Sequence, residues 1–124
     1  MSSFRDLLVW QKAHALVLRI DLVIARIQRR RPRLADQLGR SAESVTACIA
    51  EGRGRATDKD FAHFISMAIG SATEVENHVQ RGFDLGLIPQ AEHESLTESV
   101  IEVRKMLIGL HKRLRGRKTG ELEH

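Results

Sequence analysis

The chain has 124 residues, a formal charge of +4 at pH 7 and a sequence pI near 9.8. This length predicts one domain, the 42% apolar content excludes a disordered chain, and 4% aromatic residues without Tyr favour an aliphatic, helical core. The positive charge favours an anionic partner, such as nucleic acid, an acidic protein or anionic lipid, or else serves solubility alone.

Three features bear on the compartment and on the domain boundary. Cys48 is the single cysteine, so no intrachain disulfide forms, and its apolar neighbours predict a buried, inert thiol. The sequence has no uninterrupted run of 18 apolar residues and no signal-peptide pattern at its start, and we expect a cytoplasmic protein. Residues 122–124 resemble the remnant of a purification tag. We therefore expect a domain at residues 1–115 and a flexible tail at residues 116–124.

The first helix is expected at residues 5–29. Its apolar residues follow the 3,4 spacing of a bundle seam, at Trp10, Ala13, Val17, Ile20, Ile24 and Ile27. A second apolar strip follows at seven-residue intervals, at Val9, Leu16 and Val23. Both strips are buried if the helix lies deep in the core, and otherwise the second strip contacts another subunit.

Pro32 ends this helix, and a second helix is expected at residues 33–51. Its inward positions are Leu34, Leu38, Ser41 or Ala42, Val45 and Ile49. A third helix is expected from Thr57, where Asp60 three residues later indicates an N-terminal cap, to about Asp84, with Gly86 as a left-handed stop. Its inward positions are Phe61, Phe64 or Ile65, Ala68, Ala72, Val75 and Val79.

The fourth helix is expected to begin near Pro89 and to face inward with Leu96, Val100, Val103, Leu107, Leu110 and Leu114. No segment has the period of a β-strand. Four helices with short connections predict an all-α fold, an antiparallel up-down-up-down four-helix bundle.

The connection between the second and third helices reads EGRGRAT, residues 51–57. We expect a structural turn in which Gly52 ends the helix in a left-handed conformation and Gly54 adds a second bend. Glu51 faces the negative end of its helix dipole, so we expect compensation by amides of the next helix, by Arg53 or by Arg55. The stretch lacks the spacing, the lysine and the strand of a phosphate-binding P-loop.

Four stretches together resemble a known bacterial family: FRDLLVWQKA at 4–13, DQLGRSAESVTACIAEGRGR at 36–55, DFAHFISMAIGSATEVE at 60–76 and LGLI at 85–88. The chain is similar to the four-helix-bundle proteins encoded by intervening sequences of 23S rRNA genes. The accessory variability protein of diversity-generating retroelements belongs to the same group. The resemblance implies a homo-oligomeric ring, a pentamer in known members, and association with nucleic acid in the retroelement branch.

Alternating helix directions collect the cations at the two ends of the bundle. One end is expected to carry the cations of the second turn and of the last helix, namely Arg53, Arg55, Lys112, Arg113, Arg115, Arg117 and Lys118. The other end is expected to carry Arg29, Arg30 and Arg31, together with Arg26 and Arg33. Such surfaces can bind the phosphates of structured RNA or DNA with little sequence specificity, because Trp10 and the four Phe are expected mostly in the core. The alternative without a binding function is that these cations only stabilise helix C-termini and keep the bundle soluble.

No catalytic, metal or cofactor site is indicated, so we expect a protein that is not an enzyme. Glu74 and His78 share a helix face, but the Glu-x-x-His pattern of di-iron bundles is absent. Gly70 and Ser71 are expected to allow close helix packing, with Ser71 bonded to its own helix. The alternative function is a protein-interaction scaffold, such as an accessory subunit of a retroelement reverse transcriptase, and no membrane partner is expected.

Overall fold

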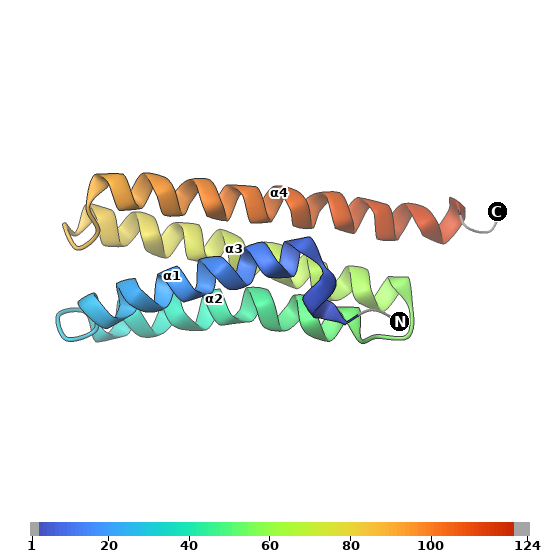
Figure 1. Ribbon diagram of the computed structural model, residues 1–124, viewed down its shortest axis with the longest axis horizontal. Helices are drawn as coiled ribbons and strands as arrows, with labels where there is room; N and C mark the ends of the chain where they lie inside the picture. Colours follow the sequence, from blue (N-terminus) through green and yellow to red (C-terminus); the bar gives the residue numbers. More distant parts are fainter. Residues whose placement is uncertain (1–2, 121–124) are drawn as a thin grey trace.

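The computed structural model describes residues 3–120, with side chains to residue 116, and this part contains helices and no strand. A 3-10 turn, η1 (Phe4–Asp6), precedes α1 (Leu8–Ile27), α2 (Pro32–Arg53), α3 (Asp58–Asp84) and α4 (Gln90–Gly120). The four α-helices run alternately up and down, and each packs against the next (Figure 1). Within these residues no helix is both long and apolar enough to cross a membrane.

The helix ends follow from local chemistry. Pro32 occupies the first turn of α2, where its missing N–H removes no helical hydrogen bond. The Thr57 hydroxyl accepts a hydrogen bond from the backbone N–H of Asp60 at 3.1 Å and caps α3. Gly86 has φ = 76° and ends α3 in a Schellman motif, in which Leu87 N–H donates to the Gly82 carbonyl and Gly86 N–H donates to the Phe83 carbonyl. The predicted cap and the predicted left-handed glycine are both confirmed.

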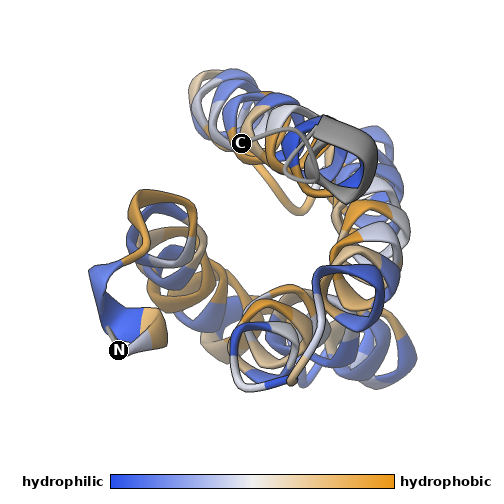
Figure 2. Cartoon of the chain, turned by 90° about the vertical axis from the view of Figure 1, so that its right-hand side faces the viewer, coloured by the Kyte–Doolittle hydropathy of each residue, from blue (hydrophilic) through white to orange (hydrophobic). Residues whose placement is uncertain are grey.

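The core is a single aliphatic cluster drawn from all four helices. Figure 2, viewed along the bundle, shows the four helices arranged around this common interior. The second strip of α1, Val9, Leu16 and Val23, lies buried in this cluster beside Ile20 and Ile27 of the first strip, whereas Trp10 and Ile24 of the first strip are half-buried against it. The second strip is therefore covered by the chain itself and needs no partner.

The seam between α1 and α4 is the least closely packed of the four (Figure 2). Polar side chains close it at seven-residue intervals along α1. The Lys12 ammonium lies 3.5 Å from Glu102, the Arg19 guanidinium donates to Ser95 and Ser99 at 2.6 and 2.8 Å, and the Arg26 guanidinium donates twice to Glu92 at 2.5 and 3.0 Å. The hydrogen bonds that Arg26 donates to the Glu92 carboxylate raise the pKa of Arg26 above its ordinary value, against the smaller effect of burial. These three cations of α1 therefore all pair with residues of α4 across this seam.

The expectation for Gly52 is wrong. Gly52 lies inside the last turn of α2, and no glycine between residues 3 and 120 other than Gly86 has a positive φ. A Cβ at Gly52 would lie 2.8 Å from the Phe64 Cβ and 2.9 Å from the Phe61 Cδ1. Gly52 is therefore required by the close approach of α2 and α3, and Gly54, with φ = −85°, ends the helix in a right-handed conformation.

Further expectations about packing also fail. Ser71 donates from its hydroxyl to the Ser44 hydroxyl at 2.8 Å, so it bridges α3 to α2 instead of bonding to its own helix. A Cβ at Gly70 would meet no atom within 4 Å, so this glycine serves no close packing. Of the five large aromatic residues only Phe61 is buried, and Phe4, Trp10, Phe64 and Phe83 are half-buried.

The expected domain boundary at residue 115 stays a prediction. The backbone of α4 is helical to Gly120, five residues past the expected end of the domain at residue 115. The remainder of the expected tail, including the tag-like residues 122–124, lies outside the described residues.

Candidate nucleic-acid interface

The expected grouping of cations at two ends follows the helix directions (Figure 1). We call one end the C-terminal pole: it contains Arg53, Arg55, Lys112, Arg113 and Arg115. We call the other end the arginine-turn pole: it contains Arg29, Arg30, Arg31, Arg33 and Arg81. Arg117 and Lys118 belong to α4 at the C-terminal pole by their backbone, and their side chains lie outside the described residues. Arg26, expected at the arginine-turn pole, is instead paired with Glu92.

At the C-terminal pole, Arg55 of the α2–α3 turn interacts with a carboxylate and with an aromatic ring. Arg55 lies 3.8 Å from the Glu51 carboxylate, and its guanidinium stacks over the Phe64 ring at 5.1 Å. Both members of the ion pair are about half exposed, at 58% for Glu51 and 45% for Arg55, so the pair adds little stability. The turn itself is held by backbone hydrogen bonds of 3.1 Å, from Gly54 to Glu51 and from Arg55 to Gly52. Arg53 is half-buried, and Lys112, Arg113 and Arg115 are exposed on the end of α4.

At the arginine-turn pole all five arginines are exposed to solvent. Within residues 3–116, none of the five arginine side chains of this pole forms a hydrogen bond or an ion pair. Arg29, Arg30, Arg31 and Arg33 follow one another around the α1–α2 turn. Arg81 comes from the last turn of α3, about fifty residues later, and was not among the cations expected at this end.

A cleft of about 620 Å³ opens at the arginine-turn pole, between α2 and α3. Four arginines line it, Arg30, Arg31, Arg33 and Arg81, and its other polar lining residues are Gln37, Asn77 and His78. No carboxylate lines it. The start of α2, with its free backbone N–H groups and positive dipole end, lies at the same place.

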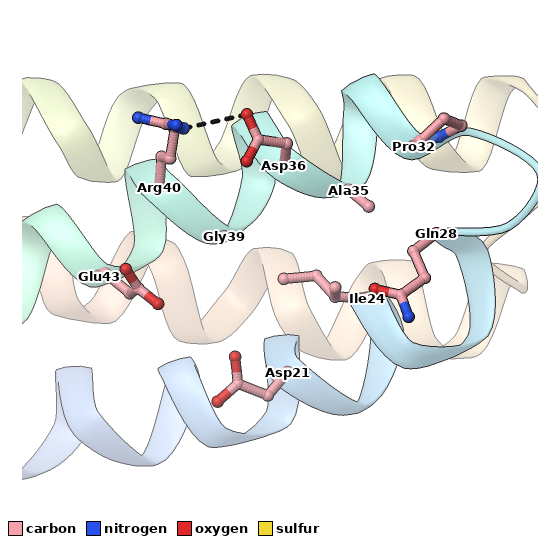
Figure 3. Close-up of a pocket in the computed structure, with 9 residues that line it drawn as sticks. All are labelled: Asp21, Ile24, Gln28, Pro32, Ala35, Asp36, Gly39, Arg40 and Glu43. Carbon is pink, nitrogen blue, oxygen red and sulfur yellow. Dashed lines mark hydrogen bonds and ion pairs between the residues drawn. The ribbon is translucent and has the colours of Figure 1, made fainter.

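A larger groove of about 710 Å³ runs between α1 and α2 and has the opposite charge. Asp21 and Glu43 extend their carboxylates into it, and Asp36 accepts a hydrogen bond from Arg40 at 3.0 Å (Figure 3). Three carboxylates against one cation repel phosphate. Pro32 lines both this groove and the basic cleft, so the two surfaces meet at the α1–α2 turn.

Three further side chains considered in the sequence are Cys48, Glu74 and His78. Among the described residues, no three His, Cys, Asp or Glu side chains are grouped to hold a metal ion. Cys48 is buried as expected, with its Sγ 3.8 Å from the Ser44 hydroxyl. Glu74 and His78 line a small cleft of about 320 Å³ that continues the basic cleft along the α2–α3 groove. The Nδ1 atom of His78 is buried without a hydrogen-bond partner in residues 3–116.

Comparisons with known proteins agree with this architecture. A sequence model described as 23S rRNA-intervening sequence protein matches residues 5–109. The chain is also similar to a crystal structure from Bacteroides thetaiotaomicron, a protein of unknown function from the S23 ribosomal protein family. That similarity has a TM-score of 0.80 at 23% identity, and it covers 85% of this chain and 99% of the other. No curated protein sequence matches the chain significantly.

Proposed function

Because the chain belongs to the 23S rRNA-intervening sequence protein family, we propose that it is a non-enzymatic homo-oligomer that binds structured RNA or DNA through phosphate contacts. The name of the family ties it to ribosomal RNA, which favours RNA over other anions. The two basic poles would supply the contacts.

This proposal rests on one observation: the arginine side chains of the arginine-turn pole form no ion pair or hydrogen bond within residues 3–116. Arginines that only served the fold would be expected to pair with carboxylates, as Arg26, Arg40 and Arg104 do with Glu92, Asp36 and Glu76. The five arginines of the pole have no such partner within residues 3–116. A guanidinium group binds a phosphate with two parallel hydrogen bonds, and it remains charged at every physiological pH.

Recognition would depend on shape and charge with little reading of bases. The basic cleft has no Phe, Tyr or Trp in its lining on which a base could stack. Trp10 is stacked on His14 with ring centroids 4.6 Å apart, on α1 and away from the cleft. Phosphate contacts alone position a protein on nucleic acid but do not select a sequence.

The test is a salt titration of binding to a labelled RNA hairpin, followed by fluorescence anisotropy. If the five arginines of one pole each hold one phosphate, the slope of log affinity against log salt is about −4.5. Raising the salt fourfold then weakens binding by about 500-fold. An affinity that hardly changes over this range would refute phosphate binding as the function.

The oligomeric part of the proposal is supported by a third strip on α1. Leu8, Leu18 and Leu22 are 59%, 53% and 68% exposed, and together with Ala15 and Ala25 they follow a spacing of three, four and seven residues. This spacing is that of a helix-packing seam, but the strip faces away from the core. A second copy of the chain would cover it, and a closed ring of copies, such as a pentamer, would repeat the basic poles around its axis.

The same strip favours the second candidate function, a protein-interaction scaffold or an accessory subunit of a nucleic-acid enzyme such as a retroelement reverse transcriptase. Charge reversal of Arg53, Arg55, Arg113 and Arg115 separates the two candidates at the C-terminal pole. Nucleic-acid binding weakens under the first candidate, whereas partner binding through α1 persists under the second.

A further inference from the structure

We propose that the basic cleft between α2 and α3 is the principal phosphate site, and that it holds consecutive backbone phosphates of a structured nucleic acid. This inference rests on the proposed function and assigns it to one of the two poles. The four cleft arginines reach the site from two segments, Arg30, Arg31 and Arg33 from the α1–α2 turn and Arg81 from α3.

The shape of the surface favours this cleft over the C-terminal pole. Lys112, Arg113 and Arg115 are exposed and lie close together in the sequence near the end of α4. The hollow next to them, between α1 and α4, is mainly apolar, with Leu8, Met106 and Leu110 in its walls. Arg113 and Lys105 border this hollow but do not face each other across a polar cleft. In the basic cleft, by contrast, cations from two segments surround one concave space, where their fields add.

The neutral polar groups of the basic cleft are also suited to phosphate. Gln37 and Asn77 form no side-chain hydrogen bond within residues 3–116, so their amide N–H groups remain available as donors. His78 lies at the inner edge, and its Nδ1 has no hydrogen-bond partner within residues 3–116. A buried polar atom in this state costs free energy, and a phosphate oxygen reached by a small rotation of the ring would remove that cost.

The surrounding charges set the direction of the bound strand. On the α1 side, the carboxylates of Asp21, Asp36 and Glu43 repel a phosphate backbone (Figure 3). On the α3 side, a smaller cleft continues from the basic cleft, and Gln37 and His78 line both of them. The smaller cleft is also lined by Arg40 and Ser44. Glu74 is the single carboxylate of that smaller cleft. The backbone therefore leaves the basic cleft along the α2–α3 groove and avoids the α1–α2 groove.

The size of the cleft argues for a polymer over a single ion. A volume of about 620 Å³ lies in the range of about 300–1,000 Å³ that holds ligands much larger than one phosphate. Four guanidinium groups also carry a charge of +4, which exceeds the charge of about −2 on one phosphate. Free phosphate and mononucleotides offer the same chemistry as the backbone, so the experiment has to distinguish these sources.

The test compares three double variants by anisotropy with a labelled RNA hairpin at one salt concentration and along a salt series. Arg33→Gln with Arg81→Gln removes two cleft contacts, which lowers the salt slope by about 1.8 and the affinity by about 60-fold at ~0.1 M salt. Arg113→Gln with Arg115→Gln probes the C-terminal pole and should lose less. Lys59→Gln with Lys105→Gln removes the same net charge from exposed positions outside the cleft, and should lose little.

Circular dichroism confirms that each variant is folded, and Arg30→Gln with Arg31→Gln repeats the test from the other wall of the cleft. If the cleft variants behave like the lysine pair while Arg113→Gln with Arg115→Gln abolishes binding, the assignment is wrong and the proposed function stands. If wild-type binding is independent of salt, both are wrong. Competition with inorganic phosphate and with a nucleoside monophosphate identifies the source, because either one matching the affinity of the hairpin would overturn the polymer assignment.

Discussion

Substitution of Gly52 by alanine tests whether this glycine is required by contact or by backbone conformation. Its backbone is helical, so alanine is compatible with the local dihedral angles. The new Cβ would lie 2.8 Å from the Phe64 Cβ, where carbon atoms ordinarily stay about 3.5–4.0 Å apart. The Phe64 Cβ is attached directly to the backbone of α3 and cannot rotate away. The two helices must therefore separate by about 0.7 Å.

The magnitude follows from two opposing effects. Overpacking of this kind costs about 1–3 kcal/mol, and alanine in place of glycine in a helix returns up to about 1 kcal/mol. With about 1 kcal/mol returned, Gly52→Ala is expected to lower the free energy of unfolding by up to about 2 kcal/mol. Gly70 provides the matched control, because it is exposed within α3 and its Cβ would meet nothing within 4 Å. Gly70→Ala is expected to raise the free energy of unfolding by about 1 kcal/mol.

The assay is urea unfolding followed by circular dichroism at a fixed protein concentration, so that any change of assembly affects both variants alike. Thermal unfolding gives a second readout, at about 3–5 °C per kcal/mol for a chain of this size. The two variants should shift in opposite directions. Equal stabilisation by both substitutions would refute the argument that α2 and α3 need Gly52 for their close approach.

Three further outcomes are expected. Leu18→Glu with Leu22→Glu should leave the circular dichroism signal of the helices unchanged. In light scattering, the double variant should have the mass of a single 14.0 kDa chain. A wild-type protein that is already monomeric would contradict the proposed ring. Thr57→Ala removes the acceptor of the Asp60 N–H and should lower stability by about 1 kcal/mol in urea unfolding, and an unchanged midpoint would show that the cap is unimportant. Gly86→Ala forces a side chain into the left-handed region and should cost about 1–2 kcal/mol, seen as a lower melting temperature, and an equal melting temperature would argue against the Schellman stop.

Much of the fold could be predicted from the sequence, because the relevant interactions are local. The inward positions of α2 and α4 repeat every three to four residues, and Leu38, Val45, Val100 and Leu107 are all buried. The helix ends at Pro32, Thr57 and Gly86 likewise depend on neighbouring residues alone. The separation of cations into two poles followed from helix direction, which short connections determine.

The candidate site was only half predictable. The run of arginines at the α1–α2 turn is visible in the sequence, but Arg81, Asn77 and His78 carry no local signal that places them beside it. Their position depends on the rotation of α3 about its own axis relative to α2, which long-range packing decides. A charged residue in the last turn of the third helix was the available hint, since that turn lies at the same end as the arginine run.

The sequence by itself determined four amphipathic helices, their caps and their alternating directions, because the 3.6-residue period and the capping residues act within a few positions. Only the tertiary structure decided which faces meet. Gly52 lies where two helices approach closely, and Ser71 donates a hydrogen bond to Ser44 on the neighbouring helix. One additional apolar strip of α1 is buried in the core, whereas the strip that contains Leu18 and Leu22 is exposed. The physical reason is that helix rotation and separation are set by the close packing of side chains far apart in the chain, and no single segment contains that information.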